Sequence, residues 1–169
     1  MSLIVWTDQM CVGVKLLDND HKKIVLLINE LHEGLLSGRA KPELDRVFEN
    51  LVSFTRIHFS HEEQLLVQTG YPGAAAHQQE HKTMIRQVLE LQERFRSGAP
   101  LGMYLDGMEL LKSWLFNHMY GSDQEYGPYL EANGVNSILI SWEIPIGVVR
   151  EQQAAESTMA IAHGRHSRK

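Results

Sequence analysis

The sequence predicts an all-α fold: an antiparallel up-down-up-down four-helix bundle with an N-terminal arm and a C-terminal extension. Four long segments repeat apolar residues at steps of three and four, which is the spacing of one helix face. Short runs of glycine, proline and small polar residues separate them, and no strand pattern competes before residue 134. We expect an arm over 1–17 packed on the bundle, the bundle over 18–133, and an extension over 134–169.

The four helices follow in order along the chain. Asp18 or Asp20 can cap the start of the first, Pro42 and Glu43 open the first turn of the second, and Gly121 interrupts the fourth. The predicted inward positions are His21, Ile24, Ile28, Leu31 and Leu35 in the first helix, Leu44, Val47, Leu51, Phe54, His58, Glu62 and Leu65 in the second, His77, His81, Met84, Val88, Leu91 and Phe95 in the third, and Leu101, Tyr104, Met108, Leu111, Leu115 and His118 in the fourth.

The extension differs from the bundle in composition. Residues 137–149, SILISWEIPIGVV, are β-branched and apolar but are broken by Glu143 and Pro145, so they form no membrane span. This segment is a candidate short strand or a docking segment for a protein partner. The residues after it are polar, and we expect a weak helix that ends in disorder, so that the extension is partly disordered.

Composition excludes several classes of function. A formal net charge of -5 with scattered Lys and Arg provides no basic patch, so we expect no nucleic-acid partner. No run of eighteen apolar residues predicts a membrane span, and the first residues lack the features of a signal peptide, so we expect a cytoplasmic protein. The single cysteine, Cys11, excludes an internal disulfide and a CxxC metal site.

Polar residues occupy positions on these helix faces that the apolar rhythm assigns to the interior. One histidine on an apolar face is more often a hydrogen-bonded core residue than a ligand. Five histidines together are different, because the free-energy cost of burying so many unpaired polar groups would exceed a domain's net stability of roughly 5 to 15 kcal/mol. They must therefore partner one another or a metal.

The lengths of the connections place these residues at one height in the bundle. At a rise of about 1.5 Å per residue, His21 and His58 each lie roughly 25 Å from the first turn. Glu62 lies about 12 Å before the second turn, and the two histidines of the third helix lie about 7 and 13 Å after it. His118 lies roughly 27 Å beyond the third turn, level with the same two histidines.

Asp123 needs a local irregularity to join this group. It follows His118 by five residues, which on a regular helix leaves the two side chains about 140° apart. Convergence therefore requires a π-bulge or a kink between them, which Gly121 favours and which is common at functional sites. Without such a site, Asp123 would be an ordinary solvated acid.

The spacing of these residues resembles the ligand signature of the hemerythrin family, specifically the bacterial hemerythrins. The resemblance rests on His21, HFSHE at 58–62, HQQEH at 77–81 and HMYGSD at 118–123, and extends over residues 4 to about 133. It implies two non-haem iron ions, one bound by His77, His81 and His118 and the other by His21 and His58, with Glu62, Asp123 and an oxo or hydroxo group as bridges. It also implies that Glu62, rather than His61 or Glu63, faces inward.

The resemblance further implies reversible dioxygen binding, for carriage, storage, delivery or sensing. With these bridges one iron has six ligands and the other five, so one position stays open for dioxygen. The expected pocket is apolar, with Tyr126 beyond the ligands and hydrogen-bonding near Asp123. A branched aliphatic residue is more usual in the family where this chain has a methionine. The pocket residues, which also serve as ordinary core, are Ile24, Ile28, Phe59, Trp114, Leu115 and Met119.

Other functions remain as alternatives. A diiron oxidase or peroxide-reducing enzyme is one, but ferritin-like oxygen-activating sites use Glu-x-x-His pairs, which this chain lacks. We therefore predict no enzyme, apart from weak oxidase or peroxidase side activity. A structural zinc ion needs only four ligands, and metal storage is a further alternative. The last is a regulatory module that reports the iron state to a partner through 134–169.

Overall fold

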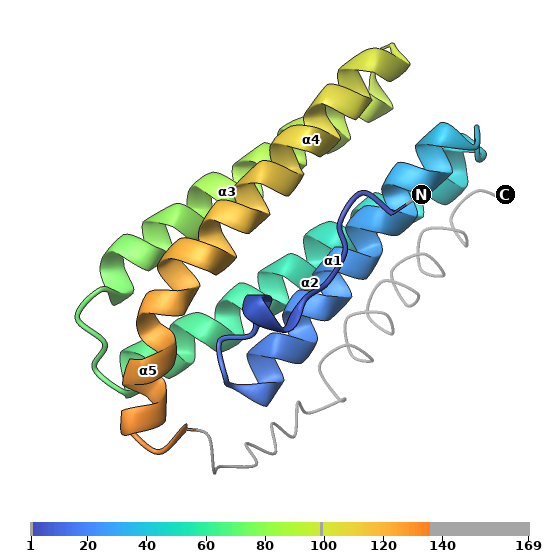
Figure 1. Ribbon diagram of the computed structural model, residues 1–169. Coiled ribbons are helices and arrows are strands. Elements are labelled where there is room, and N and C mark those ends of the chain that lie inside the picture. Colours follow the sequence, from blue (N-terminus) through green and yellow to red (C-terminus); the bar gives the residue numbers. More distant parts are fainter. Residues whose placement is uncertain (1, 99, 136–169) are drawn as a thin grey trace, which may run out of the picture. The chain divides into compact units, whose positions relative to one another are not determined.

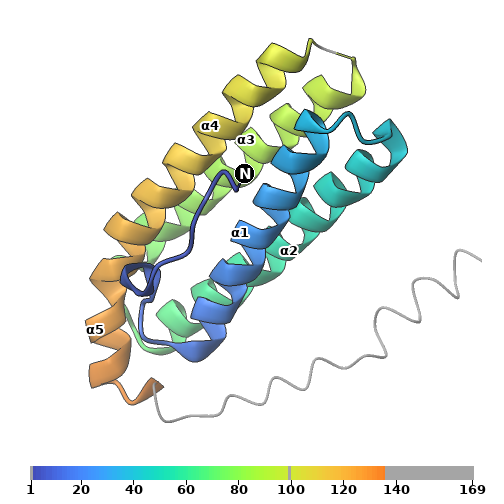
Figure 2. The ribbon, with the colours of Figure 1, turned by 45° about the vertical axis from the view of Figure 1, so that its right-hand side comes forward.

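The computed structural model describes residues 2–98 and 100–135, and within them every regular element is helical (Figure 1). The long helices lie side by side and alternate in direction, as Figures 1 and 2 show, so the predicted all-α four-helix bundle is confirmed. The apolar segment 137–149 lies outside the described residues. The elements in order are η1 (Asp8–Met10), α1 (Lys15–Leu36), α2 (Lys41–Gln68), α3 (Ala74–Arg96), α4 (Leu101–Asn117), the π-helical segment η2 (His118–Asp123) and α5 (Gln124–Ala132).

The N-terminal arm lies against α1. The backbone N–H of Ile4 donates to the Asn29 side chain and its carbonyl accepts from it, both at 2.8 Å. Ile4 and Met10 are buried in the hydrophobic core. Helix α1 begins at Lys15 rather than at residue 18, and no side chain caps it. The expected cap was wrong. Asp18 lies inside the first turn, and its carboxylate accepts the backbone N–H of Val12, a residue that precedes the helix, at 2.7 Å.

Tight connections set the antiparallel order. Gly38 after α1 and Gly70 after α2 have φ angles of 67° and 71°, in the left-handed region that glycine adopts without a steric penalty. In both turns the next backbone N–H donates back into the helix that has just ended, at 2.9 and 2.8 Å. The chain therefore reverses within a few residues, and each helix packs against the next.

The buried side of α2 differs from the prediction at one point. Phe54, expected to face inward, is only partly buried, whereas Thr55 is 4% exposed. Neighbouring positions on a helix point about 100° apart, so a face predicted from spacing alone can be rotated by one residue. This shift places a hydroxyl group inside the bundle, one turn before His58.

Helix α5 is fastened to the arm beside the end of η2. A Cβ atom on Gly127 would lie 2.7 Å from the carbonyl oxygen of Val12, so only glycine permits this approach. The Gln124 side chain donates to the carbonyl of Cys11 at 3.0 Å. These contacts hold the chain that directly follows Asp123 against the arm. Among the residues described, no helix combines the length and apolar character that crossing a membrane requires.

Candidate metal centre

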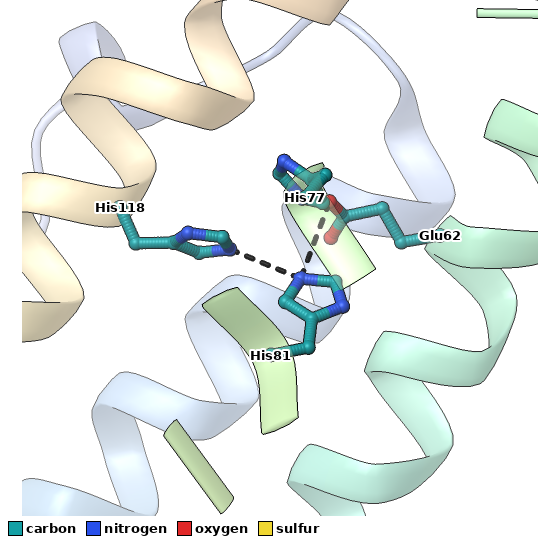
Figure 3. Close-up of side chains that lie close together, drawn as sticks. All are labelled: Glu62, His77, His81 and His118. Carbon is teal, nitrogen blue, oxygen red and sulfur yellow. Dashed lines mark hydrogen bonds and ion pairs between the residues drawn. The ribbon is translucent and has the colours of Figure 1, made fainter. Parts of the chain in front are cut away.

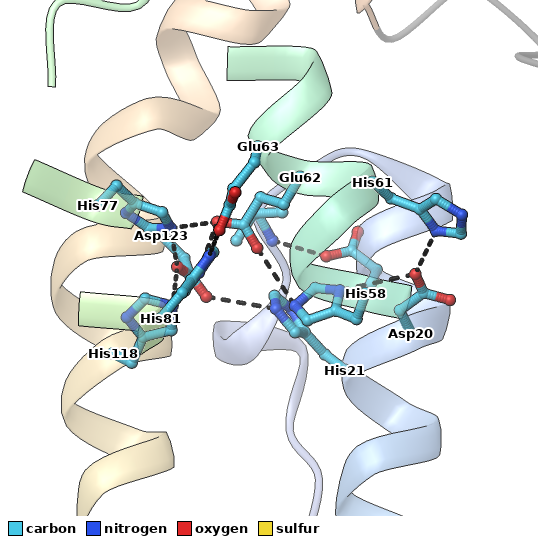
Figure 4. A network of polar contacts seen from close by, with 12 residues as sticks. Asp20, His21, His58, His61, Glu62, Glu63, His77, His81, His118 and Asp123 are labelled. Carbon is cyan, nitrogen blue, oxygen red and sulfur yellow. Dashed lines mark hydrogen bonds and ion pairs between the residues drawn. The ribbon is translucent and has the colours of Figure 1, made fainter. Parts of the chain in front are cut away.

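Seven polar side chains meet inside the bundle, and each is at most 5% exposed (Figure 4). They are all the residues that the sequence assigned to the metal ions. Helix α1 provides His21, α2 provides His58 and Glu62, α3 provides His77 and His81, and η2 provides His118 and Asp123. The helix rise predicted that these residues lie at one height in the bundle, and their side chains do lie within contact distance of one another.

One group gathers three histidines around a carboxylate oxygen (Figure 3). The Nε2 atoms of His81 and His118 lie 3.1 Å apart. The Nε2 atom of His77 contacts Oε1 of Glu62, and that of His81 lies 3.6 Å from the same oxygen. The ligand atoms of these four residues all fall within 4.8 Å of one another, which is a spacing that one metal ion could span.

A second group contains two histidines and lies beside the first (Figure 4). The rings of His21 and His58 are 4.5 Å apart, centroid to centroid. The Nε2 atom of His58 lies 3.2 Å from Oε2 of Glu62, and that of His21 lies 3.3 Å from Oδ2 of Asp123. Thus each histidine of this group has its own carboxylate.

Both carboxylates link the two groups. Glu62 directs Oε1 at the three-histidine group and Oε2 at His58. Asp123 directs Oδ1 at His118 and His77, at 3.0 and 3.4 Å, and Oδ2 at His21. A carboxylate that offers one oxygen to each of two sites is placed to bridge two cations.

The π-helical turn expected between His118 and Asp123 is present as η2. Hydrogen bonds from residue i to i+5 bring side chains five positions apart over one another, unlike the α-helical pattern. The 3.0 Å contact between the His118 imidazole and the Asp123 carboxylate follows from this geometry. The local irregularity is therefore what delivers the second bridging carboxylate.

The donor atoms fit metal ions better than they fit one another. Among the described residues, Nε2 of His21, Oε2 of Glu62 and both carboxylate oxygens of Asp123 are buried without a hydrogen-bond partner. Such atoms are costly to bury unpaired. They lie within ion-pair distance of neighbouring groups but are not aimed at them, as expected for atoms that share a central ligand. Imidazole nitrogen and carboxylate oxygen suit iron.

Protonation also favours a cation in this centre. Burial opposes charge on His58, but Asp20 and Glu62 outweigh it and raise its pKa to about 9. Burial lowers the pKa of His81 to about 2, so His81 is neutral and its nitrogen is free to bind a metal. Burial would raise the pKa of Glu62, but the His58 and His77 imidazoles hold it well below its usual value. A proton on His58 thus occupies a place that a metal ion would take.

A further layer of carboxylates contacts the outward nitrogens of three histidines. His81 Nδ1 lies 2.9 Å from Glu63, and His118 Nδ1 lies 3.1 Å from Glu80, which also accepts the Ser122 hydroxyl at 2.6 Å. Asp20 lies 3.6 Å from His58 Nδ1. Such partners fix the orientation and tautomer of a ligating imidazole.

The comparison with known proteins agrees with this geometry. The family model described as "Hemerythrin HHE cation binding domain" matches residues 12–130. This chain belongs to the hemerythrin family. The family is known for oxygen binding at a diiron site.

Individual hemerythrins cover most of the chain. It is 40% identical over 126 residues to a bacteriohemerythrin of Pseudomonas aeruginosa. The matched residues cover 75% of this chain and 80% of that protein. A bacteriohemerythrin of Stenotrophomonas maltophilia is 35% identical over 133 residues, or 79% of this chain and 85% of its own length. A crystal structure of wild-type hemerythrin is 30% identical, with a TM-score of 0.69 over 76% of this chain and 98% of its own.

A small apolar cavity borders the hemerythrin centre, with a volume of about 20 Å³. It adjoins His21 and His58, and five of the six predicted pocket residues line it: Ile24, Ile28, Phe59, Trp114 and Leu115. Met119 does not line it. That side chain is buried in the hydrophobic core instead; it lies next to His118 in the π-helical turn η2, so the two side chains point in different directions. The lining residues that were not predicted for the pocket are Leu51, Met84, Val88 and Leu111, which were predicted to face inward, and Thr55, which was not.

Tyr126 lies on the side of His77, with ring centroids 5.4 Å apart. Its hydroxyl is fully buried and makes no hydrogen bond of normal geometry within the described residues. Burial, followed by the charges of Asp123 and Glu62, raises its pKa well above the usual value. The expected neighbourhood is therefore found, but the expected hydrogen bond to Asp123 is not formed.

The sequence reasoning missed Asp20 and Glu80 as partners of the site. Each directly precedes a predicted ligand, His21 or His81, yet its carboxylate serves a histidine on a neighbouring helix. An acid beside a ligand, at the edge of the buried face, was the available signal. Glu63, which was expected not to face inward with Glu62, contacts the outward nitrogen of His81.

Proposed function

We propose that this protein binds dioxygen reversibly at a diiron centre. The observation that carries the proposal is the linking geometry of Glu62 and Asp123, each of which offers one oxygen to either histidine group. One iron would be held by His77, His81 and His118, and the other by His21 and His58, with both carboxylates and an oxo or hydroxo group between them. Two irons so bridged supply reversible electron transfer to dioxygen.

The unequal number of histidines decides where dioxygen would enter. The iron held by His21 and His58 would have fewer protein ligands than the iron held by three histidines, and could therefore take up dioxygen. The apolar cavity borders these same two histidines. Its aliphatic and aromatic walls exclude water and so limit the proton supply that would promote loss of reduced oxygen species. The residues around the centre thus suit binding better than turnover.

The remaining residues keep the ligands in place. Glu63, Glu80 and Asp20 contact the outward nitrogens of three histidines. These contacts orient each ring and increase its basicity as a ligand. The donor set of five imidazoles and two carboxylates carries little negative charge, which gives little support to the high oxidation states that a diiron oxidase needs. It favours a carrier or sensor over an enzyme.

Absorption spectroscopy of iron-loaded protein tests this function. The reduced protein should be nearly colourless, should develop a visible charge-transfer band on exposure to dioxygen, and should lose the band under vacuum over repeated cycles. Two irons per chain, measured by elemental analysis, should accompany this behaviour. Irreversible oxidation with rapid release of peroxide would instead assign the protein to the diiron oxidases.

A further inference from the structure

One polar side chain that is not a proposed ligand lies among the apolar walls of the cavity. Besides three histidines of the centre, the described lining consists of aliphatic and aromatic residues, a methionine and Thr55. Thr55 is 4% exposed and lies one turn before His58 on α2. It therefore borders the side of the cavity that His58 also borders.

The hydroxyl of Thr55 differs from those of other helical threonines. Thr69 and Thr83 donate to the backbone carbonyl four residues earlier, at 2.7 and 3.2 Å. That local bond is the usual way for a helical threonine to satisfy its hydroxyl. No such bond, and no other within the described part of the chain, is made by Thr55.

The Thr55 hydroxyl oxygen also differs from the Tyr126 hydroxyl, which is wholly enclosed without a partner. The oxygen of Thr55 is not among the wholly enclosed unpartnered atoms of the described residues, and Thr55 lines the cavity, so its hydroxyl can face that space. An unpaired hydroxyl in an apolar interior is unfavourable, and valine, which has nearly the same shape, would avoid that cost. A threonine here is explained if its hydroxyl has a partner that arrives with the ligand.

We propose that Thr55 determines ligand specificity by donating a hydrogen bond to the outer atom of a small ligand held in this cavity. This inference rests on the proposed function, because it places the inner atom of the ligand on the iron bound by His21 and His58. Ligands whose outer atom accepts a hydrogen bond are then favoured over apolar molecules of equal size. A cavity of about 20 Å³ admits only two- or three-atom ligands.

Azide binding to the oxidised, iron-loaded protein tests the role of Thr55. Azide is a three-atom anion whose outer nitrogen accepts a hydrogen bond, and its binding is followed by absorbance titration. Thr55→Val should weaken azide binding at least about tenfold, the effect of losing a hydrogen bond to a charged group. Thr55→Ser, which keeps the hydroxyl, should stay within about twofold of the wild type. Thr83→Val is the matched control, because its hydroxyl bonds the backbone instead.

The outcomes separate this inference from the proposed function. Wild-type protein that holds no iron would overturn both, and iron-loaded wild type that binds no azide would overturn the inference alone. Two irons per chain with equal azide affinity in wild type and Thr55→Val would overturn the inference alone. If the valine variant does not load iron, Thr55→Ser and Thr55→Ala, which differ only by the hydroxyl, give the same comparison. Metal-free Thr55→Val should unfold at no lower temperature than the wild type, and a clear loss of stability would show a purely structural role.

Discussion

Replacing Glu62 by glutamine should nearly abolish iron binding, whereas the same change at the adjacent Glu63 should not. Glu62 is fully buried, and its two oxygens serve both histidine groups. Two unit charges about 4 Å apart interact with about 4 kcal/mol at an effective dielectric constant of about 20. Removing a carboxylate charge beside a divalent ion therefore costs at least about 4 kcal/mol, or roughly a thousandfold in affinity.

Glu63 provides the matched control one position away. Its side chain is 30% exposed, and the contact it makes with the centre is with the outward nitrogen of His81. Glutamine keeps an accepting oxygen, so Glu63→Gln should weaken iron binding by no more than about tenfold, the low end for such outer contacts. Iron per chain, measured after dialysis against a graded chelator series, separates the two variants, and circular dichroism verifies that both are helical. Equal iron loss in the two variants, or two irons retained by Glu62→Gln, would refute the bridging role.

Four other outcomes are expected. His118→Ala should lower iron content towards one per chain because the three-histidine group loses a ligand, and two irons in that variant would contradict the assignment. Tyr126→Phe should raise the unfolding free energy of the metal-free protein by about 1 kcal/mol, because the buried hydroxyl makes no hydrogen bond of normal geometry. A loss of stability in chemical denaturation would show that the hydroxyl stabilises the fold through its neighbour Glu62. Gly127→Ala should destabilise the fold by about 1 to 3 kcal/mol, because its Cβ would lie 2.7 Å from a backbone carbonyl oxygen of the arm. The control Gly102→Ala, whose Cβ would have no atom within 4 Å, should be neutral or stabilising. Equal melting temperatures of the two variants would exclude the steric effect at Gly127. Because the folded-state pKa of His58 is raised to about 9, its proton stabilises the metal-free fold fully below the unfolded pKa of about 6.5, and less as the pH rises through 9. Iron should therefore displace a proton from His58 at pH 7 and bind more tightly as the pH rises to about 9. Calorimetry in buffers of different ionisation enthalpy should detect the released proton, and iron affinity that does not change with pH would exclude this displacement.

The sequence predicted the fold and the convergence of the polar residues because both depend on regular helix geometry. A constant rise per residue relates His21 to His58 across the first turn without any knowledge of packing. The same regularity identified the one place where it had to fail, between His118 and Asp123, and η2 is that irregular turn. Spacing was informative because the bundle is straight and its connections are short.

The outer contacts could not be predicted in this way because they depend on how far a side chain reaches around its helix. Asp20 and Glu80 lie at the edges of buried faces, where spacing alone does not distinguish solvent from a neighbouring helix. Met119 and Thr55 show the same limit. Met119 lies in the irregular turn η2 and does not line the cavity, whereas a rotation of α2 by one position brings Thr55 to it.

The cavity and the ligand cluster impose opposite demands on the same short stretch of α2. The polar side chains of His58 and Glu62 need partners of opposite charge, whereas Phe59, between them in the sequence, forms part of the apolar wall of the cavity. The helix meets both demands because neighbouring positions face different directions: the Phe59 ring stacks on His81 with centroids 3.7 Å apart, while Glu62 reaches the two histidine groups. Phe59 therefore lines both the cavity and a groove on the outer surface, which His81 also lines, and forms part of the wall between them. Replacing Phe59 should admit water to the three-histidine group, so the apolar surroundings on which the proposed function depends include a residue that is not a proposed metal ligand.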